Sequence, residues 1–136
     1  MAHSDGKPRT ILVVDDDVSV RTVIGAVLRR QTFEVLETDT GEEALRLVQA
    51  RGAPIHLVIS DLNMPEMGGW VLLDQLRRSC PSLRVLLVSG EDQTDDALSR
   101  GANAPIAFLA KPFTPAQLSN AVKRLLEDAS PTEGAA

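Results

Sequence analysis

Residues 58–70 read VISDLNMPEMGGW, in which an apolar run ends at a single carboxylate, Asp61. Pro65 follows shortly afterwards, and then the pair Gly68 and Gly69. Proline and glycine interrupt regular structure, so this stretch predicts a buried strand that stops at Asp61 and opens into a turn. An acid in this position is either a turn or helix-capping residue or part of a functional site. The ends of the other expected strands decide between the two.

Apolar runs of strand length alternate with segments of helical periodicity along the rest of the chain. The expected strands are residues 10–15, 33–38, 55–60, 83–89 and 106–110. The expected helices are residues 18–30, 40–48, 67–78, 92–100 and 114–126. The fourth of these helices has few apolar residues and is followed by a proline-containing lead-in, 101–107, so we expect it to be short or irregular.

The alternation of strands and helices predicts the fold class. Strands separated by helices imply right-handed crossovers and therefore a parallel sheet. Most of the strands lack a clean polar alternation, as is typical when helices cover both faces, whereas FEVLET (33–38) alternates more and suits an edge. We expect an α/β fold, a flavodoxin-like (βα)5 doubly wound parallel sheet of five strands in the order 2-1-3-4-5. Two helix starts carry capping signals, Thr40 with Glu43 and Thr114 with Pro115.

Polar residues stand where the expected strands end. Ligands of a doubly wound sheet bind outside the carboxyl ends of its strands. The residues found there are Asp15, Asp16, Asp17, Asp61, Ser89 and Lys111. Two carboxylates about 4 Å apart repel by about 4 kcal/mol at an effective dielectric of about 20, so a cluster of acids is costly unless a cation binds.

Mg²⁺ would resolve that repulsion, since it prefers oxygen ligands and usually takes one or two protein carboxylates together with a phosphate. Asp16 and Asp61 suit this role. Lys111 supplies a positive charge for an anion, and Ser89 supplies a hydroxyl that can donate to a phosphoryl oxygen. These are the parts that phosphoryl transfer needs, with Asp61 as the best candidate for the nucleophile.

The composition excludes several other classes. A length of 136 residues indicates one domain, and a formal net charge of −5 argues against binding to nucleic acid or to an anionic membrane. Cys80 is the single cysteine, so no intramolecular disulfide is possible. The polar start of the chain lacks the apolar core of a signal peptide, and no window reaches the roughly 18 apolar residues of a membrane span, so we expect a cytoplasmic protein.

Four motifs, in this order and at this spacing, resemble the receiver domain of two-component response regulators. They are VVDDD (13–17), VISDLNMPEMGG (58–69), LLVSG (86–90) and FLAKPFTPAQL (108–118). The resemblance covers about residues 9–127. It leaves residues 1–8 and 128–136 as flexible ends.

The resemblance implies a role for each matching acid. Asp61 corresponds to the phospho-accepting aspartate. Asp16 corresponds to a direct ligand of Mg²⁺, and Asp15 to an acid that acts mostly through water. Asn63 stands where the family binds Mg²⁺ through a backbone carbonyl. Asp17 falls at a variable position and is expected to be solvated.

The resemblance also implies roles at the other strand ends. Ser89 and Lys111 would bind the phosphoryl group. Phe108 stands at the aromatic switch position, although an ordinary core role fits it equally well. The Lys111–Pro112 peptide bond is expected to be cis, and Ser89 is expected to move with the switch.

The implied function is signalling by a phosphoryl group. Asp61 would take the group from the phosphohistidine of a histidine kinase or histidine phosphotransfer protein. A downstream protein would then bind the face formed by the fourth helix, the fifth strand and the fifth helix. Such a domain catalyses only its own phosphorylation and dephosphorylation, so we do not expect an enzyme that acts on other substrates.

Other interpretations stay open or are disfavoured by single residues. The chain is either a stand-alone regulator or the C-terminal receiver module of a hybrid histidine kinase, and a phosphorylation-independent adaptor is a further alternative. A haloacid-dehalogenase-like phosphatase needs an acid two residues after its nucleophile, where Asn63 stands here. A flavodoxin-like cofactor carrier is disfavoured by an aromatic content of 3%.

Overall fold

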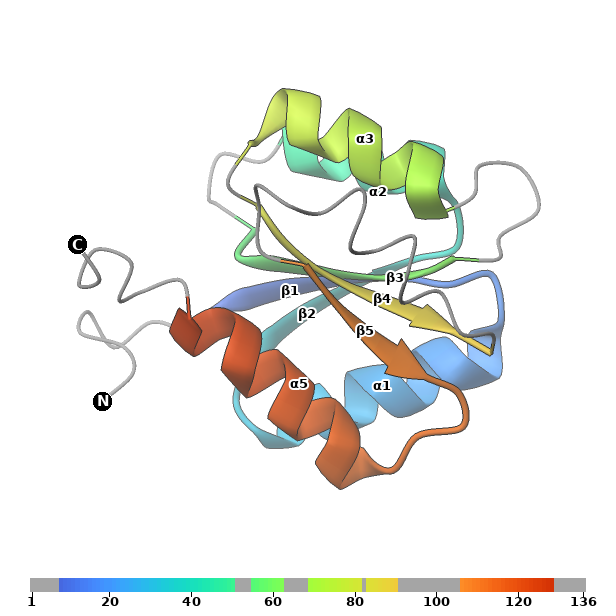
Figure 1. The fold of residues 1–136 in the computed structure, drawn as a ribbon, viewed down its shortest axis with the longest axis vertical. Coiled ribbons are helices and arrows are strands. Elements are labelled where there is room, and N and C mark those ends of the chain that lie inside the picture. Colours follow the sequence, from blue (N-terminus) through green and yellow to red (C-terminus); the bar gives the residue numbers. More distant parts are fainter. Residues whose placement is uncertain (1–7, 51–54, 63–68, 82, 91–105, 129–136) are drawn as a thin grey trace.

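A five-stranded parallel sheet forms the centre of the molecule in the computed structural model, which describes residues 8–50, 55–62, 69–81, 83–90 and 106–128 (Figure 1). The strands are β1 (Thr10–Val14), β2 (Glu34–Thr38), β3 (Leu57–Asp61), β4 (Arg84–Ser89) and β5 (Ile106–Ala110). Their order across the sheet is β2-β1-β3-β4-β5. This confirms the doubly wound fold and the strand order predicted from the sequence.

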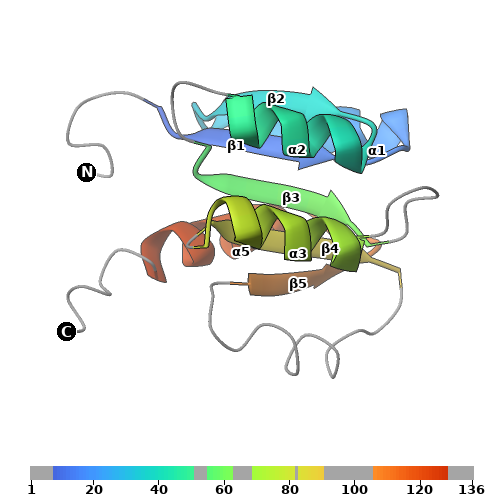
Figure 2. The ribbon, with the colours of Figure 1, turned by 90° about the horizontal axis from the view of Figure 1, so that it is seen from above.

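Helices cover both faces of the sheet. The described helices are α1 (Val18–Arg30), α2 (Gly41–Ala50), α3 (Gly69–Ser79) and α5 (Pro115–Asp128). α1 and α5 lie on one face, and α2 and α3 lie side by side on the other (Figures 1 and 2). The helix expected over 92–100 falls outside the described residues.

Two apolar layers, one on each side of the sheet, make up the core. Side chains alternate along β1, so Ile11 and Val13 pack with residues of α1 and α5, while Leu12 and Val14 pack with residues of α2 and α3. All residues of β1 and β3 are buried, whereas β2 includes exposed and half-buried residues. This explains why the central strands read as continuous apolar runs and confirms that β2 is an edge.

The predicted helix starts are present. The Glu43 N–H donates to Thr40 Oγ1 at 3.1 Å, directly before α2. The Gln117 N–H donates to Thr114 Oγ1 at 3.1 Å, and Pro115 is the first residue of α5. Both hydroxyls satisfy amide groups that a helix cannot pair internally.

The ends of the chain lie largely beyond the described part. Of the flexible ends expected at 1–8 and 128–136, only Pro8 and Asp128 are described, and Asp128 is the last residue of α5. Among the helices that the structure describes, none is long and apolar enough to cross a membrane.

Thr32, two residues after the end of α1, has an unusual backbone conformation. The Thr32 N–H donates to the Arg29 carbonyl at 3.0 Å and the Phe33 N–H to the Leu28 carbonyl at 3.3 Å, the hydrogen-bond pattern that closes a helix in a Schellman motif. The motif requires a left-handed residue, and Thr32 has a φ of 68°. Glycine is the usual residue there, because a β-branched side chain is strained in this region.

We therefore predict that Thr32→Gly raises the free energy of unfolding by about 1 kcal/mol, the balance between relieved strain and the greater freedom of glycine in the unfolded chain. Urea unfolding measures the change. Thr22→Gly is the matched control, since Thr22 is exposed inside α1 and glycine there should instead lower the free energy of unfolding by roughly 0.3 kcal/mol. A loss of stability in Thr32→Gly would contradict the prediction.

Candidate functional site

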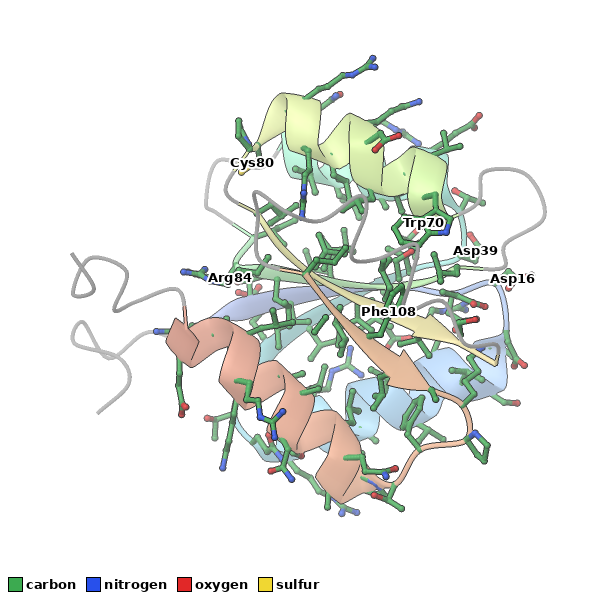
Figure 3. The ribbon with its side chains drawn as sticks, viewed as in Figure 1. Asp16, Asp39, Trp70, Cys80, Arg84 and Phe108 are labelled. Atoms are coloured by element: carbon green, nitrogen blue, oxygen red, sulfur yellow. The ribbon has the colours of Figure 1, made fainter. Side chains whose placement is uncertain are left out.

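Three carboxylates meet at the carboxyl edge of the sheet. Asp15 follows β1 and Asp61 ends β3, and these two strands are parallel neighbours, so their ends share one edge. One carboxylate oxygen from each of Asp15, Asp16 and Asp61 lies within 4.8 Å of the others. Asp15 and Asp61 are buried, whereas Asp16 is exposed at the end to which the strand arrowheads point (Figure 3).

Lys111 brings a positive charge to this cluster. Its Nζ lies 3.3 Å from Asp61 Oδ2 and 3.8 Å from Asp15 Oδ2. Lys111 directly follows β5, and its N–H donates to the Ser89 carbonyl at 2.8 Å, which ties the ends of β5 and β4 together. One ammonium group therefore pairs with the two buried carboxylates of the cluster.

Burial raises the pKa of Asp15, because the charged carboxylate loses water. The Asp17 N–H donates to Asp15 Oδ1 at 2.9 Å and lowers this pKa in part. The negative charges of Asp61 and Asp16 raise it, and the positive charge of Lys111 lowers it. The folded chain thus holds the ionised form of Asp15 at an energetic cost.

Ser89 is the last residue of β4, the strand that lies between β3 and β5 in the sheet. β3 and β4 pair so that Asp61 lies opposite Val88, and the Leu62 N–H donates to the Val88 carbonyl at 2.9 Å. Ser89 comes one residue later on β4 and is buried. The sheet register therefore brings together Asp61, Ser89 and Lys111, as the strand ends predicted.

Three further predictions concern the Lys111–Pro112 peptide bond, Asp17 and Asn63. The Lys111–Pro112 peptide bond is cis, as the resemblance implied. Asp17 is exposed, as expected, but its side chain also caps α1 by accepting from the Ser19 N–H at 2.9 Å. The signal for this cap was present, since an acid directly before a helical run is a typical N-cap. Asn63 lies outside the described residues.

Phe108 packs against α3. It lies on β5, half-buried, and its ring meets that of Trp70 edge to face, with centroids 5.8 Å apart (Figure 3). Trp70, in the first turn of α3, is itself only half-buried. The contact joins two elements far apart in the sequence, so sequence patterns could not predict it. It gives Phe108 a packing role whether or not the ring also switches.

The sequence did not predict an apolar groove beside Lys111. The groove has a volume of about 500 Å³ and lies between α1 and the segment that follows β5. Its lining residues are Ser19, Val20, Val23, Lys111, Pro112 and Phe113. Val23 is 53% exposed, although it belongs to the helical pattern that predicted α1. The groove therefore extends from Lys111, beside the charged cluster, along an apolar surface that is open to solvent.

Comparisons with known proteins show the family to which the chain belongs. Residues 11–123 match the family model of the response regulator receiver domain. The chain is 38% identical over 120 residues to the sensor kinase CckA of Brucella abortus (strain 2308), which covers 87% of this chain and 12% of that protein. It is 33% identical over 131 residues to the two-component response regulator ORR11 of Oryza sativa subsp. indica, which covers 93% of this chain and 86% of that protein.

A solved structure shows the same fold. The chemotaxis response regulator CheY4 of Vibrio cholerae matches with a TM-score of 0.79 and 29% identity, over 88% of this chain and 100% of that one. The chain therefore belongs to the family of response regulator receiver domains of two-component systems, which are signalling switches. It spans only 12% of CckA and 28% of the transcriptional regulatory protein GlrR of Escherichia coli (strain K12), so the functions of those whole proteins are not carried over.

The raised pKa of Asp15 predicts a pH-dependent gain of stability in Asp15→Asn. Because the pKa is raised in the folded state, ionising Asp15 destabilises the fold as the pH rises through that pKa. Below the ordinary aspartate pKa of about 3.9 the carboxyl is protonated in both states and this cost is absent. In metal-free buffer Asp15→Asn should therefore be more stable than the wild type at pH 7.5, and the gain should shrink towards pH 4.

Urea unfolding in EDTA at a series of pH values measures this difference. Asparagine keeps an oxygen for the Asp17 N–H, so the hydrogen bond at Oδ1 is conserved. Asp74→Asn, at an exposed position of α3, is the matched control for the removal of a carboxylate. An Asp15→Asn variant no more stable than the wild type at pH 7.5 would disprove the prediction.

Proposed function

We propose that this chain is a phosphorylation switch in which Asp61 accepts a phosphoryl group from a phosphohistidine of a partner protein. The observation that supports this proposal is the position of the Asp61 carboxylate, buried beside two further acids and 3.3 Å from Lys111 Nζ. A stable fold gains nothing from three crowded acids, so their convergence favours a chemical role over a phosphorylation-independent adaptor.

The donor set fits Mg²⁺. Carboxylate oxygens are hard ligands, and receiver domains generally bind Mg²⁺ at such an acidic cluster. Asp16 and Asp61 would bind the ion directly, Asp15 through water, and Asn63 through its backbone carbonyl. When bound, Mg²⁺ would offset the negative charge of the acids and of the incoming phosphoryl group.

The protein groups would then act as follows. An Asp61 carboxylate oxygen attacks phosphorus and the phosphorus–nitrogen bond breaks. Its electron pair returns to the imidazole nitrogen of the donor. The imidazole leaves as the neutral ring if its other nitrogen already carries a proton, and otherwise takes a proton from water. The phosphoryl group adds a charge of about −1.5 to −2. Lys111 would pair with one of its oxygens and the Ser89 hydroxyl would donate to another. Water later cleaves the acyl phosphate, so the chain acts only on its own carboxylate.

The groove next to Lys111 supports a protein as the donor. It is continuous with the site through Lys111 and otherwise mainly apolar, with Val20 and Val23 on one wall and Phe113 on the other. We propose that the histidine kinase or histidine phosphotransfer protein packs an apolar surface here. Its phosphohistidine would then lie within reach of Asp61.

The output is proposed to pass through Ser89 and Phe108. Movement of Ser89 towards the phosphoryl group would shift the end of β4, and Phe108 lies opposite Leu87 on that strand. The face that binds the target would include β5 and α5, together with the expected helix at 92–100, which lies outside the described residues. A cytoplasmic location and no contact with nucleic acid belong to the same proposal, in line with a net charge of −5.

Intact mass after incubation with Mg²⁺ and a small-molecule phosphodonor tests the chemistry. The wild type should gain one phosphoryl group of about 80 Da, and Asp61→Asn should gain none, because the amide is not a nucleophile under these conditions. Asp74→Asn, which removes an exposed carboxylate of α3, should gain the group normally. Equal labelling of Asp61→Asn would show that the acceptor is another residue.

Substitution in the groove separates partner binding from chemistry. We predict that Val23→Asp lowers the rate of transfer from a phosphorylated histidine kinase at least tenfold, because the added charge faces an apolar contact. Labelling by the small-molecule donor should be unchanged. Val71→Asp is the matched control, since Val71 is 49% exposed on α3 and away from the groove. Equal transfer to Val23→Asp and the wild type would rule out the groove as the docking surface.

A further inference from the structure

Arg21 contacts the backbone of the acidic site from α1. Its Nη1 donates to the main-chain oxygen of Asp15 at 2.6 Å. This carbonyl belongs to the peptide group that joins Asp15 to Asp16, two of the three acids in the cluster. The Arg21 side chain is only 17% exposed, so the contact is largely sheltered from water.

The carbonyl lies beyond the paired part of β1. The pairings of β1 with β2 and with β3 both end at Val14. One residue later, the Asp15 N–H donates to the Thr38 carbonyl at 3.1 Å, and Asp15 Oδ1 accepts from the Asp17 N–H at 2.9 Å. Arg21 adds a third point of attachment, on the side of the peptide group that leads to Asp16.

Glu37 on β2 holds the Arg21 guanidinium in place. Arg21 Nε lies 3.6 Å from Glu37 Oε1, and Arg29 Nη1 lies 2.9 Å from Glu37 Oε2. Gly25 leaves room for this glutamate, because a Cβ at that position would lie 2.7 Å from Glu37 Oε2. A glycine inside a helix destabilises it relative to alanine, so α1 is less stable here than it could be.

We propose that Arg21 is a positioning residue of the site. It fixes the orientation of the Asp15–Asp16 peptide group, and Glu37 and Gly25 maintain Arg21 in the geometry that does so. The inference rests on the proposed function, because the property that Arg21 controls is the affinity of the acidic cluster for Mg²⁺. Groups that orient metal ligands typically change metal affinity by 10- to 100-fold when they are replaced.

Calorimetric titration of the full chain with Mg²⁺ tests this inference. Arg21→Met keeps the length of the side chain and removes the donor, so its Kd should rise about tenfold. Arg21→Lys should recover part of the affinity, because an ammonium group can still donate to the carbonyl. Arg46→Met is the matched control, since Arg46 pairs with Glu43 on the surface of α2 and should bind Mg²⁺ like the wild type.

Gly25→Ala provides a second variant that a merely structural role would not explain. Alanine should raise the stability of α1. Its Cβ would displace Glu37, so Mg²⁺ affinity should fall severalfold while stability rises. This variant also decides the matter if Arg21→Met does not fold, as judged by circular dichroism.

Failure of the inference about Arg21 can be distinguished from failure of the proposed function. A folded Arg21→Met variant with the Kd of the wild type, or Gly25→Ala with unchanged affinity, would overturn the role of Arg21 and leave the proposed function standing. A wild type that does not bind Mg²⁺, or that binds it no better than Asp16→Asn, would overturn the proposed function and this inference with it.

Discussion

Repulsion among Asp15, Asp16 and Asp61 is the constraint on which the rest of the site depends. One oxygen from each lies within 4.8 Å of the others, two of the three side chains are buried, and Lys111 Nζ pairs with Asp61 and Asp15. At an effective dielectric of about 20, each close pair of like charges costs about 4 kcal/mol. The negative charge of the cluster therefore favours the binding of a divalent cation. A phosphoryl group on Asp61 would increase that negative charge further.

The sheet makes this crowding possible. β1 and β3 are central strands whose apolar side chains fill both layers of the core, so the polar residues that follow them are held firmly at one edge. β4 and β5 add Ser89 and Lys111 at the same edge, linked by the hydrogen bond from the Lys111 N–H to the Ser89 carbonyl. The rigid core thus supports acids that would otherwise separate.

Much of the site was predictable because each of its residues ends a strand or comes soon after one. Strand ends are visible in the sequence, and the topology of a doubly wound sheet places them together, so Asp61, Ser89 and Lys111 could be grouped before the structure was known. The strand order followed from the alternation of strands and helices, and the family followed from the resemblance of four motifs.

Other parts could not be predicted, because they depend on contacts between distant elements. Whether Arg21 reaches back to the Asp15 carbonyl is set by the packing of α1 on the sheet, and an arginine in an amphipathic helix gives no such signal. The edge-to-face contact of Trp70 with Phe108 joins α3 to β5. The Asp17 cap shows a different limit, since an acid at a helix start can serve as a cap, a ligand or a solvated side chain with the same local sequence.

The dependence of folding stability on Mg²⁺ tests most directly whether the acidic cluster demands a cation. A ligand that binds only the folded state raises the free energy of unfolding by RT ln(1 + [L]/Kd), so wild-type stability should rise continuously with Mg²⁺ concentration, by about 2.7 kcal/mol at 100 times Kd. Asp16→Asn and Asp61→Asn should lose most of this rise, while Asp74→Asn keeps it. A wild type whose stability does not respond to Mg²⁺, or cluster variants that respond as strongly as the wild type, would contradict a cation-binding role for these three acids.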